Sequence, residues 1–103
     1  MRTITIGDHM NTLLGDPLTS GVLREVAGAW LDTDRRFTQW IDEVAKRKMA
    51  EEDMLLLVEA EEVAEKRAMD AWQAYVAGMP ESEVKLIESL QAMVDFRVGS
   101  MGR

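Results

Sequence analysis

The first candidates for chemistry are four glutamates on one short stretch of the chain, Glu59, Glu61, Glu62 and Glu65. Carboxylates at this spacing could hold a metal ion if they lay on the facing helices of a bundle. Di-iron carboxylate bundles, however, require Glu-x-x-His pairs, and this stretch holds no histidine. An EF-hand loop requires alternating oxygen ligands around a central glycine, and the sequence has no such loop. We therefore predict no metal site and interpret the glutamates as the solvated face of a helix.

The chain has one histidine, His9, which follows Asp8, and a neighbouring carboxylate could orient an imidazole for base catalysis. No nucleophile accompanies it, because residues 99–102 lack the Gly-x-Ser-x-Gly pattern and no glycine-rich phosphate loop occurs. The absence of cysteine excludes disulfides, thiolate metal sites and cysteine nucleophiles. We therefore expect a non-enzymatic protein that needs no cofactor, in which His9 has a structural or capping role.

Aromatic side chains are the candidates for binding a partner. The chain has three tryptophans and eight methionines, which is many for 103 residues. Trp30, Phe37 and Trp40 share one face of a predicted helix, and Trp72 and Tyr75 flank the small side chains of another. Such residues form either the core or a contact surface, and the sequence leaves both open. Because Trp is enriched at interface hot spots and Met adapts to irregular surfaces, we predict that these five aromatic residues bind a partner protein.

Composition and charge narrow the class of partner. Hydrophobic residues make up 47% and charged residues 30% of the chain, a globular rather than a disordered balance. The net charge of −7 resides entirely in residues 51–103, which hold twelve acidic and five basic side chains, 5 − 12 = −7, while residues 1–50 hold seven of each. This asymmetry makes nucleic acid and anionic membranes poor partners, and it suits a basic partner or simply solubility.

Hydropathy along the chain bears on its location. No apolar run approaches the roughly 20 residues that span a membrane. The N-terminus also lacks the apolar stretch of a cleaved signal peptide. We therefore expect a cytoplasmic protein, or one that is exported by a route without a cleaved leader.

The first fifteen residues are predicted to form a short extended arm followed by a helical turn. Residues 2–6 alternate polar and apolar side chains, as a short strand does, and an isolated strand must pair with another chain or stay an extended arm. A helical turn is expected over residues 8–14, with Asp8 as its cap and Gly15 as its end.

Helical spacing dominates from residue 16 onward. A first long helix is predicted over residues 16–49, with Asp16 as N-cap and Pro17 in the first position, or with Thr19 or Ser20 as the alternative cap. A break near residues 32–34 is an alternative to one continuous helix. Its apolar seam repeats every seven residues, as in a coiled coil, at Leu23, Trp30, Phe37 and Val44.

Two further helices are predicted over residues 51–77 and 80–98. A turn is expected near residues 48–51, although no glycine or proline marks it and one continuous helix is the alternative. Gly78 is expected to stop the second helix, Pro80 to start the third and Gly99 to end it. Alanines at positions 60, 64, 68 and 71 would let a neighbouring helix approach closely.

These elements predict a single all-α domain over residues 1–103. It is either an elongated helical hairpin or a three-helix bundle with long helices, and a short extended N-terminal arm precedes it. The expected function is a protein–protein interaction module, such as an adaptor, chaperone, inhibitor or assembly factor of the kinds found in phages and secretion systems. The partner is expected to be another protein, and the chain to form a homodimer or higher oligomer.

A DNA-binding function is the alternative. Residues 3–9, Thr-Ile-Thr-Ile-Gly-Asp-His, resemble the strand and turn of ribbon-helix-helix antitoxins, and residues 20–26 resemble the opening of their second helix. The resemblance covers about the first third of the chain. It implies that strands from two chains pair, that Arg2, Thr3 and Thr5 face DNA, and that the acidic C-terminal part binds a toxin.

Overall fold

The computed structural model describes residues 4–46 and 50–102, and this part of the chain forms four helices and no strand. The helices are α1 (Ile6–Gly15), α2 (Gly21–Lys46), α3 (Glu51–Val76) and α4 (Ser82–Met101). The all-α class predicted from the helical spacing is therefore confirmed. None of the described helices is both long enough and apolar enough to cross a membrane.

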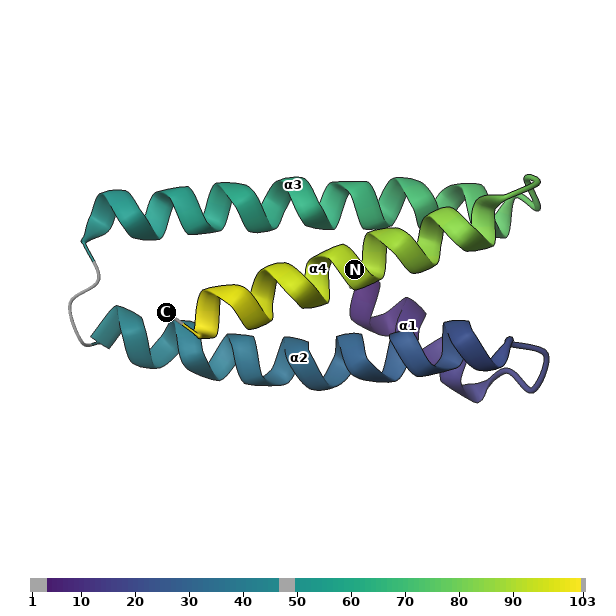
Figure 1. The fold of residues 1–103 in the computed structure, drawn as a ribbon, viewed down its shortest axis with the longest axis horizontal. Helices are drawn as coiled ribbons and strands as arrows, with labels where there is room; N and C mark the ends of the chain where they lie inside the picture. Colours follow the sequence, from purple (N-terminus) through teal and green to yellow (C-terminus); the bar gives the residue numbers. More distant parts are fainter. Residues whose placement is uncertain (1–3, 47–49, 103) are drawn as a thin grey trace.

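The two longest helices, α2 and α3, run in opposite directions along the long axis, and α4 passes diagonally between them (Figure 1). α4 starts beside the C-terminal end of α3 and finishes beside the C-terminal end of α2, and it packs against both helices. The short α1 packs mainly against α2 and also contacts α3. This arrangement is 44 Å long and 20 Å across its shortest dimension.

The core lies where all four helices meet, toward one end of the molecule. Its largest fully buried side chains come from α1, α2 and α4: Ile6, Met10, Leu23, Leu86, Leu90 and Met93. From α3 the core receives Ala68, Ala71 and Trp72, which all belong to the second half of that helix. The small side chains at positions 68 and 71 let α4 approach α3 closely, as the alanine spacing predicts. The first half of α3 contributes no buried residue.

The N-terminal segment differs from the prediction. Ile6 is the first residue of α1, so the strand expected over residues 2–6 is wrong at its end, while residues 2 and 3 lie outside the described residues. Thr5 rather than Asp8 caps the helix: the Asp8 N–H donates to Thr5 Oγ1 at 3.2 Å, and the Thr5 N–H donates to Asp8 Oδ2 at 2.9 Å. α1 ends at Gly15, as predicted. Ile6 faces inward with Met10, and this burial explains why helix replaces strand.

The long helix α2 starts later than predicted and is continuous. Asp16 does not cap it; its Oδ1 accepts from the Leu18 N–H at 2.9 Å within a turn. The alternative cap Ser20 is confirmed, because its Oγ accepts from the Leu23 N–H at 3.3 Å. No break occurs near residues 32–34, where the Thr33 hydroxyl donates to the carbonyl of Ala29 at 2.7 Å.

The predicted first and last residues of α3 and α4 are only partly correct. α3 begins at Glu51 as predicted, but residues 47–49 of the expected turn lie outside the described residues. Gly78 ends the helical path after α3. Its φ of 72° lies in the left-handed region, which favours glycine. α4 begins at Ser82 rather than Pro80, and it continues through Gly99 to Met101, so the predicted stop at Gly99 is wrong.

Candidate functional site

The first half of α3 exposes a large apolar surface. Leu55, Leu56, Val58 and Val63 have exposed fractions between 40% and 64%. All three buried residues of α3 follow Arg67, so this half of the helix has little interior to support it. Large apolar side chains that gather on one exposed segment are typical of a binding surface.

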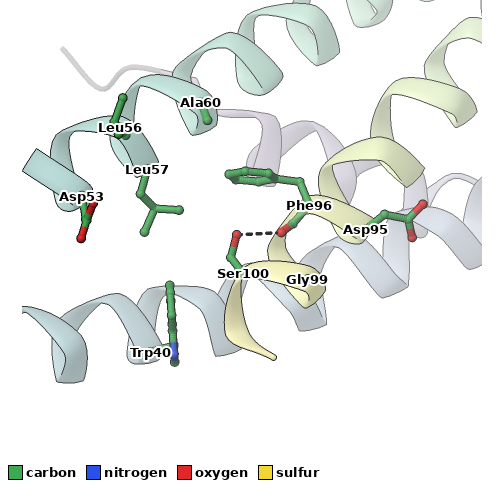
Figure 2. A pocket seen from close by; sticks show the side chains of 9 residues that line it. All are labelled: Trp40, Asp53, Leu56, Leu57, Ala60, Asp95, Phe96, Gly99 and Ser100. Carbon is green, nitrogen blue, oxygen red and sulfur yellow. Dashed lines mark hydrogen bonds between the residues drawn. The ribbon is translucent and has the colours of Figure 1, made fainter. Parts of the chain in front are cut away.

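This surface continues into a groove of about 700 Å³ that we call the end groove. Three large side chains point into it from three helices: Trp40 from α2, Leu57 from α3 and Phe96 from α4 (Figure 2). Leu56 lies on the rim, and Ala60 leaves room on the α3 wall. The remaining lining residues are Asp53, Asp95, Gly99 and Ser100. The groove is therefore apolar in its interior and polar at its margins, as ligand sites for helices are.

Two carboxylates line the end groove. Asp53 belongs to the first turn of α3 and Asp95 to α4 (Figure 2). Both are exposed, and neither forms an ion pair with any other described residue. Asp95 Oδ1 accepts one hydrogen bond, from Gln91 Nε2 at 3.0 Å. Within the described ranges no lysine or arginine lines the groove, so its margins carry negative charge alone.

A buried arginine joins the three long helices behind the groove. Arg97 of α4 is only 4% exposed, and its Nε donates to Glu61 Oε1 at 2.8 Å, while Nη2 also bonds to Glu61. The same Nη2 pairs with Asp34 Oδ1 of α2 at 3.2 Å. The guanidinium lies 4.8 Å from the ring centroid of Trp30 and 5.4 Å from that of Phe37. Arg97, Glu61 and Asp34, which we call the Arg97 cluster, thus fix the spacing of the helices that form the groove.

The Arg97 cluster is not fully satisfied. Glu61 Oε2 and Arg97 Nη1 are buried without a hydrogen-bond partner. Removing charges from water is costly unless hydrogen bonds compensate, so a buried ion cluster adds less stability than its contacts suggest.

The glutamates that suggested a metal site serve different roles. Glu61 points inward to Arg97, whereas Glu59, Glu62 and Glu65 are exposed on the same helix. Across the residues that the structure describes, no three acidic or histidine side chains converge on one point. The solvated-face interpretation therefore holds for three of the four glutamates.

The five predicted partner-binding residues divide into buried and accessible ones. Trp30, Phe37 and Trp72 are buried within the single chain, and the indole N–H of Trp30 donates to Met93 Sδ at 3.3 Å. Trp40 and Tyr75 are half-buried. Trp40 lines the end groove, whereas Tyr75 packs on Trp72 with ring centroids 5.8 Å apart, in the second half of α3. The partner-binding role stays a prediction, and Trp40 is the residue best placed to have it.

His9 lies far from the end groove. Its imidazole stacks on Trp72, with ring centroids 4.3 Å apart and planes inclined by 18°. This stack joins α1 to α3. The geometry favours the structural role predicted for His9.

Sequence reasoning missed most of the end groove. It did not single out Leu56, Phe96 or Arg97, and it placed Leu57 only beside the alanines of the helix. A signal was present in the apolar run Met54–Val58, which covers every side of a helix within five residues. A helix segment that is apolar all round needs neighbours on all sides, and in this chain Leu55, Leu56 and Val58 lack them.

Comparison with known proteins supplies no assignment. No protein-family model, curated protein or solved structure matches this chain. Its function is therefore inferred from the end groove and the side chains around it.

Proposed function

We propose that this protein is a non-enzymatic helical interaction module that binds another protein in the end groove. The observation that carries the proposal is the exposed apolar first half of α3, which continues into an apolar groove of about 700 Å³. Burying this surface against a partner would be favourable by about 25 cal/mol for each Å² of apolar area removed from water. An adaptor, chaperone, inhibitor or assembly factor would present such a surface.

The bundle is suited to this role because its two ends are built differently. We propose an elongated three-helix bundle of α2, α3 and α4 with α1 as a supporting helix. The end with α1 holds the core, and the end groove lies away from it, lined by α2, α3 and α4. The core can therefore keep the chain folded while the end groove receives a partner. A second copy of the chain in the groove would make it the homo-oligomer that the sequence predicts.

The DNA-binding alternative receives little support. It requires residues 3–6 to form a strand that pairs with a second chain. Thr5 instead caps α1, and Ile6 is 1% exposed within the core. An arm freed for strand pairing would have to expose Ile6 and break this cap.

Affinity purification with matched variants tests the proposed function. Leu57 points into the end groove (Figure 2). Leu18 is 90% exposed and belongs to the segment between α1 and α2, which lies at the opposite end of the molecule (Figure 1). The immobilised full-length chain, its Leu57→Gln variant and its Leu18→Gln variant would each be exposed to a lysate of the source cell. We expect mass spectrometry to find a protein that the native chain and Leu18→Gln retain and that Leu57→Gln loses. Retention of the same proteins by all three chains would contradict the proposal.

Circular dichroism and light scattering complete this test. The far-ultraviolet spectra of the three chains should coincide, which shows that a lost partner does not reflect unfolding. Leu56→Gln, on the exposed rim, is a second variant in case Leu57→Gln folds poorly. Light scattering on each pure chain would show whether the occupant is a second copy.

A further inference from the structure

We propose that the occupant of the end groove is an amphipathic helix of a different protein, with an apolar stripe facing the groove and lysine or arginine on its flanks. This inference rests on the proposed function and names the chemistry of the partner. Three properties of the groove support it: its shape, the sign of its charges and the poor fit of a second copy.

The shape of the groove suits a helix. α3 and α4 form its two walls and Trp40 of α2 closes it from a third side, so an added helix would contact all three helices (Figure 2). The part of α3 that lines the groove, from Asp53 to Ala60, is about 12 Å long at a rise of about 1.5 Å per residue. That length matches about two turns of an incoming helix. Such helices insert side chains at positions i, i+3 or i+4 and i+7 into an apolar groove.

The charges of the groove favour an incoming helix that has basic residues beside its apolar stripe. Asp53 and Asp95 both line the groove and have no basic partner among the described residues, and the Asp95 carboxylate points outward from the apolar interior (Figure 2). Lysine and arginine can lay their aliphatic stems along the apolar rim and place the charge beside these carboxylates. Exposed pairs of this kind add little affinity, but they choose the partner and speed association.

A second copy of the chain fits the groove poorly. A twofold interface would bring the same surface of two chains together. Residues 51–65 contain seven acidic side chains and no basic one. Two such segments in contact would repel each other. A helix with the opposite charge avoids this repulsion.

Selection from a peptide library tests the charge of the occupant. The probe is a displayed library of helical peptides with leucines at i, i+3 and i+7, in which each flanking position is Lys, Glu or Gln. The bait is the full-length native chain. We expect recovered peptides to carry Lys over Glu on the flanks by about fivefold, the ratio that about 1 kcal/mol produces. Recovery of Glu or Gln flanks, or no enriched peptide at all, would overturn the inference.

A charge-swapped bait provides the matched control. The double variant Asp53→Lys, Asp95→Lys changes two exposed side chains and leaves the apolar lining in place. It should select Glu flanks instead of Lys. If it selects Lys as the native chain does, the two aspartates do not choose the partner and the inference is wrong.

Two variants establish where the selected peptides bind. Fluorescence polarisation of the best Lys-flanked peptide should show affinity at least about tenfold weaker for Leu57→Gln than for the native chain. Leu18→Gln should bind like the native chain. Equal affinity for all three would place the peptide outside the end groove and overturn the inference.

The outcomes separate this inference from the proposed function. If light scattering shows a dimer that Leu57→Gln dissociates, a second copy fills the groove, and the basic-helix inference fails while the interaction role stands. If affinity purification finds a Leu57-dependent partner whose binding segment is acidic, the basic-helix inference also fails and the interaction role also stands. If no protein depends on Leu57, the proposed function itself fails.

Discussion

The Nε of Arg97 donates to Oε1 of Glu61 across 2.8 Å, and this bond joins the last turns of α4 to the middle of α3. Arg97 is buried, so its charge depends on Glu61 and on the more exposed Asp34 for compensation. Phe96, the neighbour of Arg97 in the chain, lines the end groove. The ion cluster therefore positions one wall of the site from behind.

Removing the acid of this pair should destabilise the protein strongly. Glu61→Gln leaves the buried Arg97 charge with Asp34 alone, and we expect the free energy of unfolding to fall by about 3 kcal/mol. Urea unfolding followed by tryptophan fluorescence measures the change. The exposed neighbour variant Glu62→Gln should change it by less than about 0.5 kcal/mol. Equal effects of the two variants would show that the Glu61–Arg97 pair does not position the helices.

The alanines at positions 60, 64, 68 and 71 of α3 should differ in how a larger side chain affects stability. A larger residue should destabilise the protein at the buried end of this row and be tolerated at the exposed end. Ala68 is fully buried in the core, whereas Ala60 is exposed and lines the end groove. Ala68→Leu should destabilise by about 1–3 kcal/mol, because a close-packed contact cannot accept the added carbons. Ala60→Leu should be nearly neutral. Thermal melting of both variants checks the pair, and a neutral Ala68→Leu would mean that α3 and α4 do not pack closely there.

Much of the fold was predictable, because the spacing of apolar residues indicates the helices and glycine indicates where a helix ends. The starts and stops at Glu51 and Gly78 followed from acids at a helix N-terminus and from the left-handed conformation of glycine. The error at the N-terminus has a physical reason. Thr5-x-x-Asp8 is a capping box, but the alternation of residues 2–6 suggests a strand equally well. α1 is too short to be stable alone, so packing of Ile6 decides between them.

The ring stack between α1 and α3 should contribute measurably to stability. The imidazole of His9 lies parallel to the indole of Trp72 at a centroid distance of 4.3 Å. His9→Ala should lower the free energy of unfolding by about 1 kcal/mol, since stacked rings contribute about 0.5–1.5 kcal/mol. His9→Phe keeps a ring at this place and should recover most of the loss. No difference between the two variants in urea unfolding would count against the stack.

Stability should depend on pH through an ion pair on the surface of α2. The hydrogen bond from Arg36, with a smaller contribution from Arg35, holds the pKa of Asp32 below its usual value. A folded-state pKa below the unfolded one adds stability above the unfolded pKa, and this stability is lost as pH falls through the folded pKa. Asp32→Asn should therefore shift the urea midpoint downward at neutral pH. In acid the midpoints of variant and native chain should converge.

Salt provides the control for the Asp32 prediction. The carboxylate and both arginines are exposed, so added salt should reduce the difference between the two chains at neutral pH. A difference that persists unchanged in acid and in high salt would show that the substitution acts through helix propensity instead.

The binding site was less predictable than the fold. Trp40 was identified because aromatic residues are common in interfaces, but Trp30 and Trp72 have the same signal and are buried. The run Met54–Val58 has apolar residues on every side of the helix, so its sequence does not tell which side lacks a neighbour. Arg97 resembles a cation that faces solvent near a helix C-terminus. Its burial arises from the crossing of three helices, which only the tertiary structure reveals.

The most direct test of the central claim is photo-crosslinking from the end groove. A photoreactive amino acid would replace Leu56 on the exposed rim or, in the control chain, Leu18 at the opposite end. Each full-length chain would be irradiated in a lysate of the source cell, and the adducts would be identified by mass spectrometry. We expect position 56 to form an adduct with one protein that position 18 does not form, at a segment with helical apolar spacing. The same adducts from both positions, or none from position 56, would contradict a partner-binding role for the groove.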